Sequence, residues 1–150
     1  MKYKFTIDDD VIKTYDIRIP VQIAYYIGVY LNDPNGWTKH GHFFEPVNYG
    51  EDVHIRLSSP ATIGKICGFE ENLSCAELGG RNMYLNADRW FHGAPASKLS
   101  LDNYRQYMVS HEIGHILGHD HKKCECKGCK APIMMQQTKG IGECRPNTSV

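Results

Sequence analysis

The segment from His111 to His121 constrains the fold of this chain more than any other part of its sequence. On an α-helix, residues four apart lie on the same face, so His111 and His115 can present imidazole nitrogens to one ion. Glu112 lies beside them without being needed as a ligand. A zinc ion held by three protein nitrogens keeps a fourth tetrahedral position for water, and an adjacent carboxylate can take the proton of that water. The segment therefore predicts a helix that carries a catalytic metal site.

Two residues compete to be the third ligand, and helix geometry distinguishes them. If the helix continued unbroken, His111 and His119 would lie about 12 Å apart along its axis, and their imidazoles would approach the ion from nearly opposite sides. Gly118 readily adopts the left-handed conformation that ends helices, so the chain can turn there and bring His121 back towards the metal. We therefore predict one Zn²⁺ ion bound by His111, His115 and His121, with Glu112 as the general base.

The full HExxHxxGxxH arrangement, complete here from His111 to His121, resembles the signature of the metzincin clan of zinc peptidases. Metzincins have a tight turn whose methionine forms an apolar floor under the zinc ligands, and the resemblance assigns this role to Met134. Many clan members carry a tyrosine just after this methionine, which can help to bind the metal or the transition state. Met135 and Gln136 stand there in this chain, so a different residue would have to assist zinc in polarising a substrate carbonyl.

Several segments that together span most of the chain carry a closer resemblance, namely residues 86–90, 101–110, 131–140 and 144–147, with shorter matches at 33–37, 57–62 and 74–75. These segments resemble an uncharacterised metzincin-like domain family known mainly from exported actinobacterial proteins. The resemblance implies a zinc-peptidase fold, a turn methionine at Met134 and a pairing of Cys124 with Cys144, but no particular substrate. The chain differs from this family in carrying Cys126 and Cys129 and in lacking an evident export signal.

The composition sets outer limits on the function. A chain of 150 residues can form about one domain with a buried core, so we expect residues 1–150 to be a single domain. The resemblance implies that this is a metzincin-like zinc metallopeptidase domain, and we expect it to be a monomer. Lys plus Arg balances Asp plus Glu at 17 each, which argues against binding nucleic acid or acidic membranes through bulk charge. The longest apolar stretch, residues 23–31, is too short to span a bilayer. Residues 1–10 lack the apolar core of a secretory signal.

The six cysteines form two groups, and an even, clustered set indicates disulfides. Disulfides in turn favour an extracellular or other oxidising compartment. The alternative is a second, structural zinc bound by the four late cysteines, but Cys124 and Cys126 are spaced more tightly than in the usual zinc knuckles. Among the fifteen possible pairings we favour Cys67 with Cys75 and Cys124 with Cys144, which leaves Cys126 and Cys129 to each other or free.

Alternating polar and apolar side chains predict half-buried strands at residues 3–7, 53–57 and 81–86. Together with two main helices, these strands predict an α+β fold, a compact metzincin-like single domain whose twisted mixed sheet is backed by the helices. The active-site helix is followed by the glycine turn and then by the methionine turn. We expect a substrate peptide to add itself to the sheet along the strand at 81–86, taken as an exposed edge.

The two main helices have recognisable starts. The first begins at Pro20, a favourable first helical residue, and ends near residues 32–34. The second begins at Ser100, which can cap it, and runs through the histidines while burying Leu101 and Met108. The apolar side of the first helix is expected to contain Val21, Ile23, Ala24, Ile27 and Leu31.

These features together predict a zinc-dependent endopeptidase that acts on a peptide or protein substrate, with Glu112 activating water at the metal. Two alternatives stay open. One is a zinc-containing binding or structural module without turnover, and the other is a zinc hydrolase that acts on a non-peptide amide. Glu112 argues against the first alternative, because a purely structural zinc site has no use for that carboxylate and usually closes the fourth position.

Overall fold

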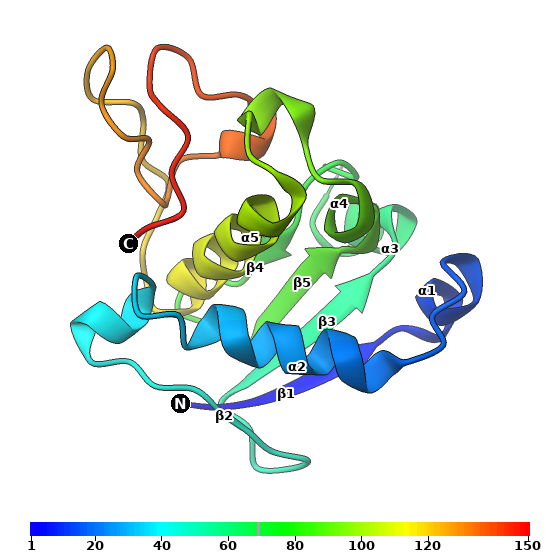
Figure 1. Cartoon of the computed structure of the whole chain (residues 1–150). Helices are drawn as coiled ribbons and strands as arrows, with labels where there is room; N and C mark the ends of the chain where they lie inside the picture. The colour runs from blue at the N-terminus through cyan, green and yellow to red at the C-terminus, as the bar shows by residue number, and fades with distance from the viewer. Residues whose placement is uncertain (69) are drawn as a thin grey trace.

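A five-stranded sheet occupies the centre of the computed structural model, which describes residues 1–68 and 70–150 (Figure 1). The strands lie in the spatial order β2-β1-β3-β5-β4. β4 pairs antiparallel with β5, whereas the other neighbouring strands are parallel, so the sheet is mixed, as predicted. The strands are β1 (Lys2–Ile7), β2 (Glu45–Pro46), β3 (Val53–Ser58), β4 (Cys75–Ala76) and β5 (Asn82–Asn86).

Two long helices back the sheet. α2 (Pro20–Leu31) and α5 (Leu101–Ile116) pack against each other and cover the same face of the sheet (Figure 1). The shorter helices α1 (Asp9–Thr14), α3 (Pro60–Ile66) and α4 (Ala87–His92) begin directly after β1, β3 and β5. The predicted α+β fold with two main helices is therefore confirmed. In the described part of the chain, no helix is both long and apolar enough to cross a membrane.

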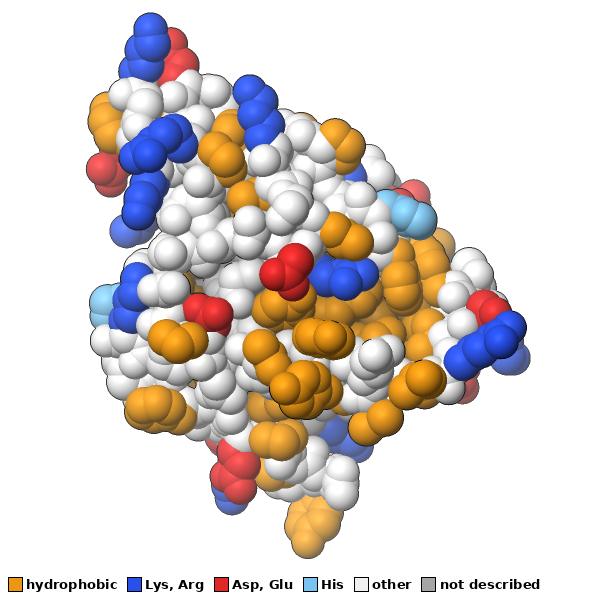
Figure 2. Space-filling model, in the orientation of Figure 1, with side chains coloured by type: hydrophobic (Ala, Val, Ile, Leu, Met, Phe, Trp, Pro, Cys, Tyr) orange, Lys and Arg blue, Asp and Glu red, His pale blue; other side chains and the backbone are white. Residues whose placement is uncertain are grey.

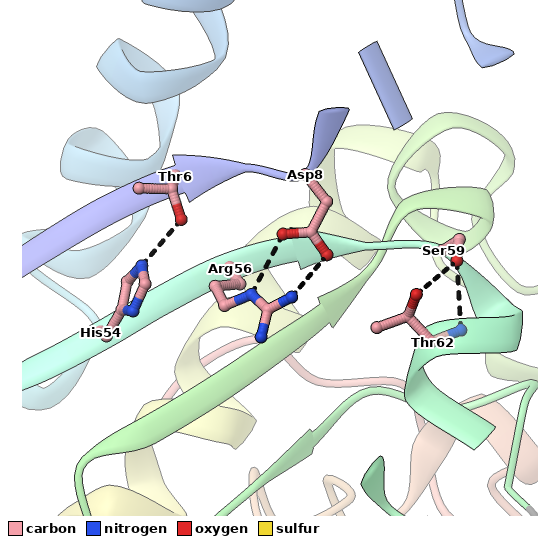
Figure 3. Close-up of polar contacts among 6 residues, drawn as sticks. All are labelled: Thr6, Asp8, His54, Arg56, Ser59 and Thr62. Atoms are coloured by element: carbon pink, nitrogen blue, oxygen red, sulfur yellow. Dashed lines mark hydrogen bonds and ion pairs between the residues drawn. The ribbon is translucent and has the colours of Figure 1, made fainter. Parts of the chain in front are cut away.

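The two faces of the sheet differ in polarity. On the face away from α2 and α5, Thr6 and His54 share a hydrogen bond of 2.7 Å, and Arg56 donates two hydrogen bonds of 3.0 Å to Asp8 (Figure 3). Both contacts join β1, or the residue just after it, to β3, so they support the register of these parallel strands. The other face carries the core, to which β3 contributes the fully buried side chains of Val53, Ile55 and Leu57.

Serine side chains cap the N-termini of two helices. The hydroxyl of Ser59 accepts a hydrogen bond of 3.1 Å from the N–H of Thr62 at the start of α3 (Figure 3). Ser100 caps α5 in the same way, 3.3 Å from the N–H of Asn103, as predicted. Short 3₁₀ helices occupy three of the connections, namely η1 (Trp37–His40), η2 (Pro95–Ser97) and η3 (Gln137–Lys139).

Two predicted core positions are wrong. Val21 and Leu101 are 73% and 39% exposed, and both lie in the first turn of their helices. Val21 is exposed because α2 contacts the core through its second half, which supplies the buried residues Ile27, Tyr30 and Leu31. The first half consequently leaves apolar side chains open to solvent, and Figure 2 shows hydrophobic side chains gathered on the face of the molecule where α2 lies in Figure 1.

The strand expected to form an exposed edge is instead an inner strand. β4 pairs with β5, with Cys75 opposite Tyr84 and Ala76 opposite Met83. A strand of two residues is too short to produce the alternation that reveals strands in a sequence. The sheet edge beside α5 is therefore β4, and the expectation that a peptide could add directly to the strand at 81–86 is corrected.

Three disulfides tie the surface loops together. The two favoured pairings are confirmed, and the remaining two cysteines pair with each other, so the four late cysteines form two disulfides rather than a thiolate metal site. The Cys67–Cys75 disulfide joins the end of α3 to the first residue of β4. The pairs are Cys67–Cys75, Cys124–Cys144 and Cys126–Cys129, with Cα separations of 6.4, 5.9 and 5.3 Å.

Asn86 connects β5, α4 and the loop that leads to β4. Its Oδ1 accepts hydrogen bonds from the N–H groups of Asp88 and Arg89, and its Nδ2 donates to the carbonyl of Glu71 at 2.7 Å. We expect Asn86→Ala to lower the free energy of unfolding by about 2–3 kcal/mol, because it removes a helix cap and leaves partly buried backbone groups without their hydrogen-bond partner. Urea denaturation measures this change. Asn86→Ser keeps a capping oxygen and should recover part of the loss, and an Ala variant as stable as wild type would contradict the assigned role.

Candidate metal centre

α5 ends in a tight left-handed turn. Gly118 has a φ of +98°, and its N–H donates a hydrogen bond of 2.9 Å to the carbonyl of His115. The N–H of His119 donates to the carbonyl of Gly114, also at 2.9 Å. These two bonds form a Schellman motif, whose left-handed position strongly favours glycine. The predicted stop of the helix at Gly118 is thus present in the structure.

The turn brings His121 to the two helical histidines. Ligand nitrogens of His111, His115 and His121 lie within 4.8 Å of one another, and Nε2 of His115 is 3.1 Å from Nε2 of His121. Nitrogens bound to one tetrahedral zinc at the usual bond length lie about 3.3 Å apart, so the spacing fits such an ion. The ring of His119 instead stacks on Trp37, with 4.5 Å between ring centroids. The structure therefore brings together the three predicted histidines and leaves His119 outside the cluster.

Backbone carbonyls orient both helical imidazoles. Nδ1 of His111 lies 2.8 Å from the carbonyl oxygen of Ile133, and Nδ1 of His115 lies 2.8 Å from that of His119. A carbonyl can only accept, so each Nδ1 carries the proton and each Nε2 keeps the lone pair that a metal needs. Burial lowers the pKa of His111 to about 3 and also lowers the pKa of His115. Both imidazoles are consequently neutral near pH 7, which is the state that binds metal.

Glu112 is a buried carboxyl group beside the histidines. It is 5% exposed, and burial raises its pKa to about 8. No ion pair found among the described residues involves it. A divalent cation held by the neighbouring histidines would favour its ionised form. Such a group can take up and release a proton near neutral pH, as a general base must.

Met134 packs under the ligand helix at Gly114. A Cβ atom on Gly114 would lie 2.5 Å from Sδ of Met134 and 2.9 Å from Cζ2 of Trp37, so only glycine allows both side chains to approach the backbone between the two ligands. Met134 is 2% exposed and lies in a tight turn, in which the N–H of Met135 bonds to the carbonyl of Pro132 at 2.9 Å. Met134 therefore packs directly against the helix backbone between the two candidate ligands.

Tyr107 is a residue of the centre that sequence analysis missed. Its hydroxyl donates to the carbonyl of Met135 at 2.8 Å, accepts from the N–H of Gln137 at 2.9 Å and lies 3.4 Å from Nδ1 of His111. It therefore joins the ligand helix to the methionine turn. Tyr107 precedes His111 by four residues on the same helix, and that spacing is the signal that could have pointed to it.

A cleft of about 300 Å³ opens beside the histidines and Glu112. Residues 73–76, which include β4, form another part of its lining. Deeper in the lining, the hydroxyls of Tyr104 and Thr138 lie 2.8 Å apart, within hydrogen-bonding distance. Gln136, from the methionine turn, also faces the cleft, whereas Gln137 is fully buried. The candidate ligands and the candidate base thus share a recess that can admit a substrate.

The sequence matches a family described as "Protein of unknown function (DUF3152)" over residues 1–146. The chain belongs to this family. No curated protein matches the sequence. Membership therefore places the chain among homologues without assigning an activity to them.

Two solved structures of archaemetzincins are similar to the chain. The archaemetzincin from Methanopyrus kandleri matches 94% of this chain and 87% of its own, with 14% sequence identity and a TM-score of 0.54. The archaemetzincin from Archaeoglobus fulgidus, solved in complex with malonate, matches 97% of this chain and 96% of its own, with 17% identity and a TM-score of 0.44. The first likeness shows that the chain has a fold similar to that of this archaemetzincin.

The close contacts at Gly114 predict the effect of adding one methyl group. We expect Gly114→Ala to lower the free energy of unfolding by about 1–3 kcal/mol, although alanine favours helices, because the new Cβ would collide with Met134 and Trp37. Gly64→Ala in α3 is the matched control, since the atoms nearest to a Cβ there belong to the side chain of Glu71, which is exposed and can move. Urea denaturation compares the two variants. Equal stability of Gly114→Ala and wild type would contradict the packing described for the methionine floor.

Proposed function

We propose that the chain is a zinc-dependent endopeptidase in which His111, His115 and His121 hold one Zn²⁺ ion. The observation that carries this proposal is the convergence of three imidazoles next to the buried carboxyl of Glu112, inside a cleft. Three neutral nitrogen ligands and one open position are typical of catalytic rather than structural zinc. The fold shared with a protein named as an archaemetzincin supports the same proposal.

Zinc in such a site supplies a Lewis acid that polarises a substrate carbonyl and makes water acidic enough to attack it. Glu112 accepts the proton of the attacking water and delivers it to the departing amine. The carbonyls of Ile133 and His119 hold the helical imidazoles in one tautomer throughout. Gln136 faces the cleft from the methionine turn, so its amide is the candidate to assist at the carbonyl in place of the tyrosine found in many metzincins.

We propose that the substrate backbone runs along β4 rather than along β5. β4 is the sheet edge on this side, and Cys75 and Ala76 of β4 line the cleft with the histidines. An extended peptide can add to such an edge through main-chain hydrogen bonds, which require no particular side chain. A peptide chain is therefore a better fit to this cleft than a small non-peptide amide, which would make no use of the strand edge.

The disulfides bear on where such an enzyme would work. Three disulfides in a small domain favour an oxidising compartment, because cytosolic reductants keep most thiols reduced. We propose that the protein acts as a monomer outside the cytosol, on peptide or protein substrates.

The role of Glu112 is tested by replacing it. We expect Glu112→Ala to reduce cleavage of an unfolded protein substrate by at least about 100-fold, because the general base is lost, while zinc content per chain stays at the wild-type level. Cleavage is measured by peptide mass spectrometry and zinc by elemental analysis of the same sample. Undiminished cleavage at full zinc occupancy would rule out Glu112 as the base. A zinc-loaded wild-type protein that cuts no peptide in a diverse library would instead favour a module without turnover or a hydrolase for a non-peptide amide.

A further inference from the structure

Trp37 reaches the end of α5 from a distant part of the chain. It lies at the start of η1, is 5% exposed, and its Nε1–H donates a buried hydrogen bond of 2.8 Å to the carbonyl of Ser110 in α5. The imidazole of His119 stacks on the indole with 4.5 Å between centroids and 19° between ring planes. The indole is thus fixed to α5 and carries on its face a residue from the segment that follows the helix.

The Trp37–His119 stack takes the place of the apolar contact that usually accompanies a Schellman motif. In a Schellman motif, the residue after the left-handed position often makes an apolar contact with the residue five places earlier. Those two residues are His119 and Gly114 here, and Gly114 has no side chain to offer. The place where a Cβ of Gly114 would be is instead shared by two other side chains, with Sδ of Met134 at 2.5 Å and Cζ2 of Trp37 at 2.9 Å. His119 therefore finds its apolar partner on Trp37 instead of on the helix itself.

We propose that the Trp37–His119 stack is a brace that positions the metal ligands His115 and His121. This inference rests on the proposed function. The carbonyl of His119 accepts from Nδ1 of His115 at 2.8 Å, so any movement of His119 moves the group that orients one ligand. The next residue, Asp120, accepts from the backbone N–H of His121 at 2.7 Å, so the other ligand lies on the same short segment. The two rings act through these contacts, and neither ring is itself a ligand.

Because His119 is exposed, an effect of its replacement on zinc binding can be distinguished from an effect on the stability of the fold. Its side chain lies at the surface, so its replacement leaves the buried core intact. Loss of a partner that orients a metal ligand typically costs about 10–100-fold in metal affinity. Because the carbonyl of His119 remains in any variant and is only released from its fixed position, we expect a loss around or just below the lower limit of that range, about 5–20-fold.

Five forms of the full chain test the brace, one of which, His111→Ala, tests the proposed zinc site itself. Each form is measured for zinc affinity by competition with a coloured chelator and for the visible absorption of bound Co²⁺. We expect His119→Ala to bind zinc about 5–20-fold more weakly than wild type and to alter the Co²⁺ absorption. His119→Phe keeps a flat ring on Trp37 and should restore both properties. The control is His40→Ala, which removes another exposed imidazole near Trp37. The ring centroids of His40 and Trp37 are 5.9 Å apart, and His40 makes no contact with the proposed ligands among the hydrogen bonds described above. This control should behave like wild type.

The outcomes separate the brace from the metal site itself. If wild type binds zinc tightly and His119→Ala binds it equally well, the brace is overturned while the proposed zinc site stands. If His119→Phe loses as much affinity as His119→Ala, stacking is not the cause, and the brace is again overturned. If wild type fails to bind zinc, or if His111→Ala binds zinc as tightly as wild type, the proposed zinc site and the brace are both overturned. An equal loss in His40→Ala would show a nonspecific effect on η1 and would overturn the brace as well.

Discussion

The two backbone hydrogen bonds around Gly118 end α5 directly after the second helical histidine and send the chain back across its last turn. If the helix continued, His119 would rise one further turn along it, and His121 would point away from the other two imidazoles. The left-handed turn therefore decides which histidine joins His111 and His115. It also places the carbonyl of His119 against Nδ1 of His115, so the same turn fixes which three histidines converge and the tautomer of one of them.

Burial of α5 explains why the centre is held so firmly. Residues 106–116 are all buried, so this part of the helix needs partners on every side. The sheet, α2, the methionine turn and Trp37 provide these partners, and the cleft occupies the remaining side. Buried polar groups require hydrogen bonds, and the two helical histidines obtain theirs from backbone carbonyls. Glu112 remains as a buried carboxyl group that faces the cleft, which is the group that the proposed chemistry requires.

Local patterns in the sequence were enough to predict the parts of the structure that depend on local chemistry. Residue spacing and the conformational freedom of glycine predict the helix that carries His111 and His115, its end at Gly118 and the approach of His121, and alternation of polar and apolar residues predicts β1, β3 and β5. Contacts between distant segments could not be predicted in this way. β4 is defined only by its pairing with β5, and the Trp37–His119 stack depends on how η1 meets the end of α5. The exposure of Val21 and Leu101 could not be predicted for the same reason. Apolar character alone does not show which turn of a helix reaches the core.

In the proposed site, three histidines and no cysteine bind one zinc ion. X-ray absorption at the zinc edge, combined with zinc content per chain, tests this ligand set in wild type and in His121→Ala. We expect one zinc per wild-type chain, only nitrogen or oxygen neighbours at about 2.0–2.1 Å, and loss of tight binding in the variant. Sulfur neighbours at about 2.3 Å, or a zinc site that His121→Ala leaves unchanged, would contradict it.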